Sequence, residues 1–202
     1  MNRENIKQLR KPFTKRSFDI ILSVFLIFCL LPFLVLAILW ISFSSPGNPF
    51  FLQKRCGYLG KPFTIFKLRT MHNNKRGGTN FTALNDERII FGGKFLRNTR
   101  VDELPQLLNV ITGNMSLIGP RPEQFELAAR YGKNIPTYGR RHNVYPGITG
   151  LAQVMLGYVD DEKGTQKKVK LDLFYIKHQS VCLDLRICIE TLKVIAHMKG
   201  AR

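Results

Sequence analysis

Acidic residues are scarce in this sequence, and they are unevenly distributed. Its 202 residues include 14 Asp and Glu against 31 Lys and Arg, a formal net charge of +17. No Asp or Glu occurs from Ile20 to Asn85. This surplus of positive charge predicts an anionic partner, such as nucleic acid, lipid headgroups or a phosphorylated substrate. The length indicates one domain, or one domain with a membrane element.

Cysteines are also few, and none has the spacing of a metal-binding or redox pair. They are Cys29, Cys56, Cys182 and Cys188. This pattern argues against a disulfide or zinc framework and favours a reducing, cytoplasmic environment. The chain also lacks the Gly-x-Ser-x-Gly, Walker and dinucleotide-binding patterns, so serine hydrolase and P-loop chemistry have no support.

Charge is absent altogether from one long segment, Ile20 to Phe43, which has Pro32 near its middle. This run of about 24 residues is long enough to cross a bilayer, since a spanning helix needs ~20. No small-residue cleavage site follows it, which argues against a secretory signal peptide.

Basic residues flank this apolar run on both sides. Six Lys or Arg lie between residues 3 and 16, and seven between residues 54 and 76. The positive-inside rule places both flanks on the cytoplasmic side. A helix that kinks at Pro32 can enter one leaflet and return. We therefore favour a re-entrant helix over the alternative, an ordinary kinked span with its N-terminus outside.

Asp19 lies just before the apolar run, close in sequence to Lys15 and Arg16. We expect it to be a paired charge at the membrane edge, or a carboxylate that is favourable near a helix N-terminus. The breaker cluster SSPGNP after the run ends the membrane element.

The rest of the chain mixes short strand-like and helix-like segments. Aromatic-rich segments within 50–71 flank a turn near Gly57 to Pro62 and predict a β-hairpin. The last helical pattern suits a membrane surface, although packing against a core is equally common for such a helix. The expected helices comprise two short ones within 86–114, one near Phe125 to Tyr131, and amphipathic ones within 167–179 and 183–199.

The segment LRNTRVDELPQ contains adjacent carboxylates, Asp102 and Glu103, downstream of Arg97 and Arg100. On spacing alone, the better interpretation is that Asp102 caps a helix and Glu103 complements its dipole. The functional alternative is that an ionised carboxylate among arginines attacks phosphorus, while the adjacent carboxylate helps to hold Mg²⁺.

The segment GPRPE places Arg121 between two prolines, which stiffen the backbone that presents its side chain. A rigid arginine beside a glycine turn suits a phosphate. The alternative is a stiff surface turn in which Arg121 pairs with Glu123.

Taken together and in this order, nine segments resemble the bacterial sugar transferases, the monotopic phosphoglycosyl transferases that begin membrane glycan assembly. The resemblance runs from Lys15 to Ile187, most of the chain. Its segments are KRSFD, QKRCG, FKLRTM, NDERI, DELPQLLNV, GNMSLIGPRP, PGITGLAQV, KLDLFYI and LDLRI, with the proline-containing apolar run after the first.

The resemblance implies transfer of a sugar phosphate from a UDP-sugar to undecaprenyl phosphate, with release of UMP, as the first membrane step of glycan assembly. The product would be an O-antigen, capsule, exopolysaccharide or glycoprotein. It implies Asp102 as the covalent nucleophile and Glu103 as its partner for Mg²⁺. It also implies phosphate contacts from Arg97 and Arg121, and from Lys67 and Arg69.

The resemblance also implies a mainly helical α+β fold at the cytoplasmic face of a bacterial inner membrane. Residues 1–45 would form the basic N-terminus and a re-entrant helix kinked at Pro32. Residues 46–202 would form a compact cytoplasmic catalytic domain with a small β-hairpin and amphipathic interfacial helices. A homo-oligomer is possible on this evidence, and neither the sugar nor the glycan pathway follows from it.

Three positions depart from the usual family pattern: Leu31 replaces Ser, and Tyr145 and Tyr158 replace Arg. Two cations expected near the nucleotide are therefore missing. Arg140 or Arg141 is a candidate replacement, and either tyrosine is a candidate to stack on uracil.

Two other classes of function are weighed against the transferase. A non-catalytic basic module that binds anionic lipid through its hairpin and last helix is the main alternative. Nucleic-acid binding is suggested only by charge, lacks a recognisable motif and needs no long apolar segment. We therefore expect no nucleic-acid partner.

Overall fold

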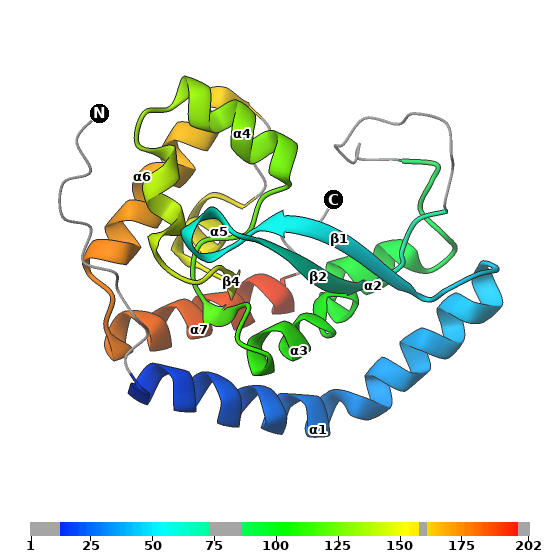
Figure 1. The fold of residues 1–202 in the computed structure, drawn as a ribbon. Helices are drawn as coiled ribbons and strands as arrows, with labels where there is room; N and C mark the ends of the chain where they lie inside the picture. The colour runs from blue at the N-terminus through cyan, green and yellow to red at the C-terminus, as the bar shows by residue number, and fades with distance from the viewer. Residues whose placement is uncertain (1–12, 73–85, 158–160, 198–202) are drawn as a thin grey trace.

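The computed structural model describes residues 13–72, 86–157 and 161–197. Its longest element is α1, Phe13–Ser44, a continuous helix of 32 residues that contains Pro32. Proline in a helix interior removes a backbone hydrogen bond and bends the helix. Accordingly, α1 curves beneath the rest of the molecule with its concave side toward the other elements (Figure 1). Re-entry into one leaflet remains a prediction, as does the division into domains at residue 45.

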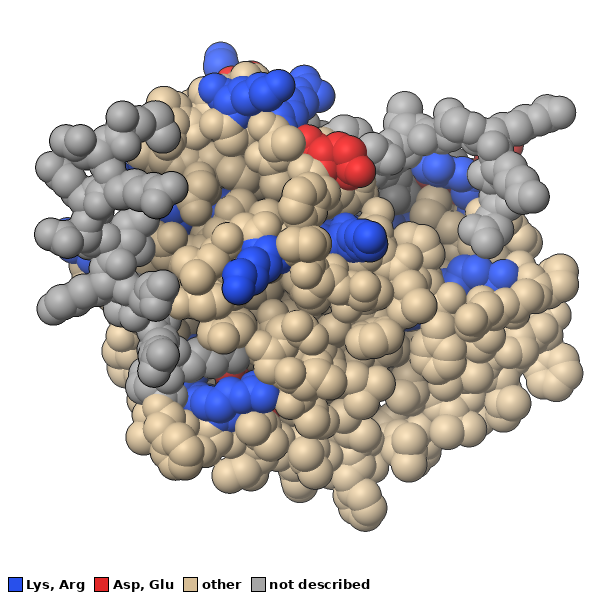
Figure 2. Space-filling view, viewed as in Figure 1, with Lys and Arg blue, Asp and Glu red and all other residues tan. Residues whose placement is uncertain are grey.

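One stripe of α1 faces the protein along the whole length of the helix. Its buried residues, Asp19, Ser23, Ala37 and Ile41, repeat at helical spacing. The remaining surface is apolar and exposed, and the outer side along α1 carries almost no charged side chains in Figure 2. An 18-residue window within α1 has a mean hydropathy of 3.1 and is only 11% buried, so its length and composition suit a membrane.

Asp19 lies inside the protein, and the prediction of a charge at the membrane edge was wrong. Its side chain is fully buried and accepts hydrogen bonds from the Ser116 hydroxyl at 2.6 Å and the Leu117 amide at 3.3 Å. The carboxylate therefore joins the first turns of α1 to a strand almost 100 residues away, a contact that local sequence does not reveal.

The predicted hairpin is confirmed. Strands β1 (Phe50–Cys56) and β2 (Pro62–Leu68) pair antiparallel and are joined by the 3₁₀ turn η1 (Tyr58–Gly60). The hairpin twists across the middle of the molecule above α1 (Figure 1). Ile65 of β2 points into the largest hydrophobic core. The segment HNNKRGGTNFTALN after the hairpin has a loop-like composition, and it falls mainly on residues 73–85, outside the described residues.

Two short helices follow, as predicted, and a 3₁₀ turn separates them. They are α2 (Gly93–Asn98), η2 (Val101–Glu103) and α3 (Gln106–Ile111). The apolar stripe of α3 packs on α1 and β2, and its residues Leu107 and Val110 are buried in the same core as Ile65. The hairpin, α1 and α3 therefore surround the short turn η2.

A short parallel strand pair joins two segments that are distant in the sequence. Strand β3 (Ser116–Ile118) pairs with β4 (Gly147–Thr149). The segment YPGITGLAQV predicts a loop with a short strand, which β4 confirms. Only β3 was missed, because turn residues surround it and three residues are too few to show strand periodicity. Close backbone approach explains the glycines beside this pair: a Cβ at Gly147 would lie 2.1 Å from the Gly119 amide nitrogen.

The remaining helices pack around the parallel pair and the hairpin (Figure 1). Side chains within residues 128–138 form a smaller core with Val169, Leu173 and Cys56 of β1. A third core, which includes Ile41 of α1, Leu68 of β2 and Leu96 of α2, lies elsewhere.

The two longest of these helices begin with side-chain caps. The Gly164 amide donates to the Asp161 carboxylate, and the Leu183 amide donates to the Ser180 hydroxyl. A membrane-surface position for the last helix remains a prediction. These elements are α4 (Phe125–Asn134), η3 (Tyr138–Asn143), α5 (Leu151–Leu156), α6 (Glu162–Lys177) and α7 (Val181–Ala196).

Candidate active site

The adjacent carboxylates lie in η2, buried between the hairpin and α3. Asp102 and Glu103 are 7% and 8% exposed. The chain turns into η2 through Arg100, whose φ of 60° is left-handed, a conformation that costs roughly 1–2 kcal/mol in a residue other than glycine. Neither carboxylate caps a described helix, because η2 and α3 both begin without a side-chain cap. The capping interpretation of Asp102 was therefore wrong.

Glu103 is held between two cations from different elements. Its Oε1 accepts hydrogen bonds from Lys67 Nζ at 2.8 Å and from Arg121 Nη2 at 2.5 Å, and its Oε2 lies 3.4 Å from Arg121 Nη1. Burial alone would raise the pKa of Glu103, but Arg121 and Lys67 hold it well below the ordinary value. Glu103 is therefore an anion at every physiological pH, and it orients both cations.

Asp102 is the opposite case, a buried carboxylate with one oxygen that no described residue binds. Its Oδ1 is buried and has no hydrogen-bond partner among the described residues. Burial and the charge of Glu103 raise the pKa of Asp102 to about 6, while Lys67, Arg97 and Arg100 oppose the rise. An ionised but unpartnered carboxylate of this kind is available to attack an electrophile.

Arg121 pairs with Glu103 and not with Glu123, so the surface-turn alternative was wrong. The Glu103 carboxylate raises the pKa of Arg121 above its already high value. Glu123 binds Lys168 of α6 instead. The fold thus brings together Glu103 and Arg121, which are 18 positions apart, and the prolines around Arg121 hold its backbone in place.

Of the predicted phosphate ligands, Arg69 lies outside this cluster. Its guanidinium donates hydrogen bonds to the carbonyls of Ser45, Pro46 and Gly47 at 2.6, 2.8 and 3.3 Å. Arg69 therefore fastens the chain that leaves α1 to the end of β2. Arg97 is close enough for its charge to lower the pKa of Asp102, and its contact with phosphate remains a prediction.

The sequence analysis missed Gln106 and Arg55. Gln106 lies about one helical turn after Glu103 and is 1% exposed, yet its Nε2 is a buried donor without a partner among the described residues. Buried polar atoms are nearly always paired, so an orphan beside the carboxylates is open to a ligand. Arg55 is a half-buried cation near Arg121, and desolvation and the Arg121 charge lower its pKa to about 10. The one-turn spacing from Glu103 was the available signal for Gln106.

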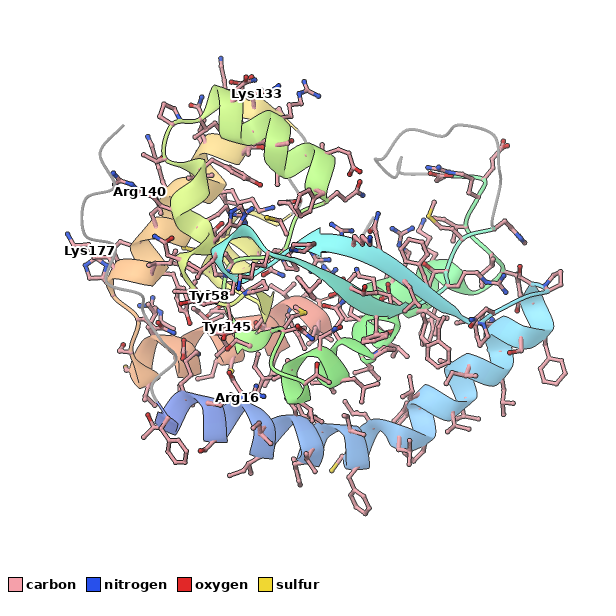
Figure 3. All side chains as sticks on the ribbon, viewed as in Figure 1. Arg16, Tyr58, Lys133, Arg140, Tyr145 and Lys177 are labelled. Carbon is pink, nitrogen blue, oxygen red and sulfur yellow. The ribbon has the colours of Figure 1, made fainter. Side chains whose placement is uncertain are left out.

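The tyrosine at one departure from the family pattern has a partner within the protein. The rings of Tyr145 and Tyr58 stack with centroids 4.4 Å apart and planes 9° apart (Figure 3). One face of Tyr145 is therefore covered. Arg141 is buried and paired with Asp172, so it does not replace the missing cation, whereas Arg140 is exposed. Tyr158 lies outside the described residues.

The carboxylates offer part of a magnesium site. Among the described residues, no group of three or more His, Cys, Asp or Glu side chains is placed to hold a metal ion. The free Oδ1 of Asp102 and the weakly bonded Oε2 of Glu103 are nevertheless two oxygens on adjacent residues. Mg²⁺ is commonly bound by one or two carboxylates together with substrate phosphates and water. The donor set therefore fits an ion that arrives with a phosphorylated substrate.

The long apolar helix and a buried carboxylate among cations are typical of a membrane-associated transferase for phosphorylated substrates. Residues 10–198 match the family model described as bacterial sugar transferase. The chain belongs to this family, as the resemblance predicted.

Relatives in the family carry names that refer to sugar transfer or to exopolysaccharide production. The chain is 42% identical over 191 residues to a UDP-N-acetylgalactosamine-undecaprenyl-phosphate N-acetylgalactosaminephosphotransferase of Aeromonas hydrophila, a match that covers 94% of this chain and 45% of that protein. It is 40% identical over 181 residues to a UDP-glucose:undecaprenyl-phosphate glucose-1-phosphate transferase of Caulobacter vibrioides, covering 88% and 68%.

It is also 39% identical over 185 residues to the exopolysaccharide production protein PSS of Rhizobium leguminosarum, covering 88% and 92%. The chain thus spans less than half of the Aeromonas protein, about two thirds of the Caulobacter protein and most of the Rhizobium protein.

The raised pKa of Asp102 predicts that Asp102→Asn stabilises the protein at alkaline pH. A raised carboxyl pKa contributes stability below the unfolded value of 3.8, and this contribution is lost as the pH rises through about 6. Asparagine avoids the burial of charge, so we expect a gain on the order of 1–3 kcal/mol in the free energy of unfolding at pH 8. Thermal unfolding in detergent at pH 8 and pH 4 measures it.

Glu190→Gln, on the exposed side of α7, is the control and should leave the melting temperature unchanged at both pH values. A lower melting temperature for Asp102→Asn at pH 8 would contradict the prediction.

Proposed function

We propose that this protein transfers a sugar phosphate from a UDP-sugar to undecaprenyl phosphate, with release of UMP, through a covalent intermediate on Asp102. The observation that carries the proposal is the buried Asp102 carboxylate, whose Oδ1 has no hydrogen-bond partner among the described residues, beside the Lys67–Glu103–Arg121 cluster. The names of the relatives add support, since two of them specify a UDP-sugar and undecaprenyl phosphate.

In the first step, an oxygen of the ionised Asp102 attacks the phosphorus attached to the sugar. The bond between that phosphorus and the bridging oxygen breaks, and UMP leaves with the electron pair. In the second step, a phosphate oxygen of undecaprenyl phosphate attacks the same phosphorus. The bond to Asp102 then breaks and restores the carboxylate, so the reaction balances without a net proton transfer.

The cations of the cluster supply what phosphoryl transfer needs most, which is positioning and neutralisation of charge on oxygen. Arg121 and Lys67 already lie on Glu103, within one residue of the nucleophile. Arg97 and Arg100 add positive charge on the side of Asp102. We assign Lys67, Arg97 and Arg121 to the phosphates of the donor and Arg69 to the support of the site.

Asp102 and Glu103 are the residues that would hold Mg²⁺, through the two oxygens that remain available. When bound, the ion would offset the negative charge of the diphosphate. Glu103 keeps its cations oriented in either case, because both bonds to Lys67 and Arg121 run to its Oε1.

Contacts at both ends of α1 support a monotopic position at the cytoplasmic face of the inner membrane. Near the N-terminal end, Arg16 donates to the carbonyls of Val110 and Ile111 at 2.5 and 2.9 Å. Toward the other end, Trp40 Nε1 donates to the Phe91 carbonyl at 3.0 Å. A straight helix of this length spans about 48 Å, more than a bilayer core. A helix tied at both ends to one domain keeps both ends on the same side.

Activity is expected to depend on Asp102 while membrane binding does not. We expect UMP release from at least one UDP-sugar in a panel supplied with undecaprenyl phosphate and Mg²⁺. Asp102→Asn should lower the rate at least 10³-fold, because asparagine cannot form the phosphoryl ester. Glu190→Gln is the matched control. Rapid quenching with donor labelled in the sugar phosphate should leave label on the peptide that contains Asp102.

A wild-type protein that binds vesicles but releases no UMP from any donor would favour the non-catalytic lipid-binding module instead. Turnover without any labelled adduct on Asp102 would contradict the covalent route alone.

The rate is expected to fall on the acidic side of neutrality. Asp102 must be ionised to attack, and its pKa is raised to about 6. The logarithm of kcat/KM should therefore rise with pH up to about 6 with unit slope and then level off. A profile that stays flat down to pH 4.5, in a range where circular dichroism shows folded protein, would argue against Asp102 as the titrating nucleophile.

The topology is expected to place both ends of α1 on the cytoplasmic side. Phe13→Cys and Ser44→Cys, each in a background without the four native cysteines, should react with an impermeant maleimide in inside-out vesicles only. Labelling of either position from the periplasmic side of intact spheroplasts would instead indicate a spanning helix.

A further inference from the structure

The backbone that presents Arg121 is held by donors at four consecutive carbonyls, residues 120–123. The Gly147 amide donates to the first at 3.0 Å and Arg141 Nη2 to the second at 3.0 Å. Arg55 Nη1 donates to the third at 3.3 Å and the Cys56 amide to the fourth at 2.9 Å. These donors come from β4, η3 and β1. Loop carbonyls usually bind water, so four protein donors in a row indicate a segment held in one conformation.

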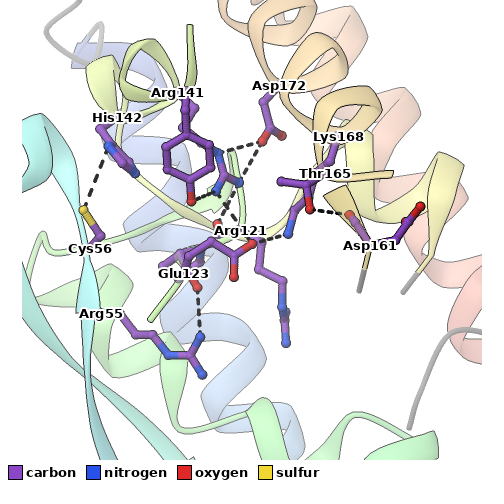
Figure 4. Close-up of polar contacts among 12 residues, drawn as sticks. Arg55, Cys56, Arg121, Glu123, Arg141, His142, Asp161, Thr165, Lys168 and Asp172 are labelled. Atoms are coloured by element: carbon purple, nitrogen blue, oxygen red, sulfur yellow. Dashed lines mark hydrogen bonds and ion pairs between the residues drawn. The ribbon is translucent and has the colours of Figure 1, made fainter. Parts of the chain in front are cut away.

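Arg141 is the donor that acts on Arg121 itself. Its side chain is 1% exposed, and its Nε and Nη2 lie 2.9 and 2.7 Å from Asp172 Oδ2 of α6 (Figure 4). Its Nη1 donates to the Tyr138 hydroxyl at 3.1 Å. Nη1 also lies 3.7 Å from Glu123 Oε1. The guanidinium thus has four partners, and the Arg121 carbonyl is the one that leads to the active site.

The consequence is a continuous path of direct contacts from α6 to the carboxylates. Asp172 orients Arg141, Arg141 holds the Arg121 backbone, and the Arg121 side chain binds Glu103 beside Asp102. An ion pair between Arg141 and Asp172 would neutralise both buried charges without any bond to the Arg121 carbonyl. Charge neutralisation therefore does not explain the hydrogen bond from Arg141 to the Arg121 carbonyl.

We propose that Arg141, oriented by Asp172, is a positioning residue for Arg121 in phosphate binding and transfer. The inference rests on the proposed function. Arg141 does not touch the substrate. It sets the place from which Arg121 reaches both Glu103 and the donor phosphate. A displacement of about 1 Å at such a group can cost roughly 100-fold in rate.

Arg141→Lys separates positioning from charge. Lysine keeps the positive charge opposite Asp172 but lacks the planar fork that bonds Asp172, Tyr138 and a carbonyl together. We expect kcat/KM to fall 10- to 100-fold. Lys168→Met is the matched control, because Lys168 pairs with Glu123 in the same buried cluster but does not contact the Arg121 backbone. It should lower the melting temperature while kcat/KM stays within threefold of wild type.

A double-mutant cycle with Arg121→Ala tests whether Arg141 acts through Arg121. Independent residues have additive effects, whereas a positioning residue loses its effect once its target is removed. The double variant Arg121→Ala, Arg141→Lys should therefore be no more than threefold worse than Arg121→Ala alone. If Arg141→Lys does not fold, Asp172→Asn takes its place in the cycle with the same expectation.

The pH profile provides a readout that a loss of stability would not move. Asp102 faces Glu103, Lys67, Arg97 and Arg100. Withdrawing Arg121 from Glu103 removes positive charge from the pair of carboxylates, so the acidic limb should shift to higher pH in Arg141→Lys. In Lys168→Met the limb should stay in place.

Two results would overturn the inference: additive losses in the cycle, or Arg141→Lys with wild-type kcat/KM and an unshifted limb. Neither result affects the proposed function, which is judged on UMP release by the wild type and its loss in Asp102→Asn.

Discussion

The ionised state of Glu103 is the constraint on which the site depends. A carboxylate at this depth requires compensation, and Lys67 and Arg121 provide it from the hairpin and from the loop after β3. Because both cations bind Glu103, the Oδ1 of neighbouring Asp102 is left buried without a hydrogen-bond partner among the described residues. The two cations lower the pKa of Glu103, whereas burial and the negative charge of Glu103 raise the pKa of the reactive carboxylate, Asp102.

Ion pairs and hydrogen bonds of charged side chains also fix α1 to the protein. Its outer face is apolar, but its first turns carry charged side chains that all point inward. Lys15 pairs with Asp184 of α7 at 2.5 Å, Arg16 binds carbonyls at the end of α3, and Asp19 binds β3. The helix is thus apolar toward its surroundings and polar where it docks, an arrangement that orients the active site relative to any membrane in which α1 lies.

Local sequence patterns predicted the secondary-structure elements better than they predicted which side chains contact each other. The hairpin, the short helices around η2, the apolar helix and the family all followed from motifs and periodicity. The capping role of Asp102 was wrong because η2 and α3 both begin without a side-chain cap. The pairing of Arg121 with Glu123 was wrong because Arg121 binds Glu103, which lies on another element. Arg69 was assigned to phosphate from the family resemblance, but it lies just past the end of β2 and its guanidinium binds the carbonyls of residues 45–47.

The sequence by itself determined which residues bring charge, rigidity and apolar surface, because these are properties of side chains and of spacing along the chain. Only the tertiary structure decided which charges meet. Burial removes the solvent that would otherwise accept every polar group, so each buried charge depends on what the fold places beside it. Among the described residues, the fold places two cations on Glu103 and no hydrogen-bond partner on Asp102 Oδ1, and it places Arg141 where it binds the backbone of Arg121.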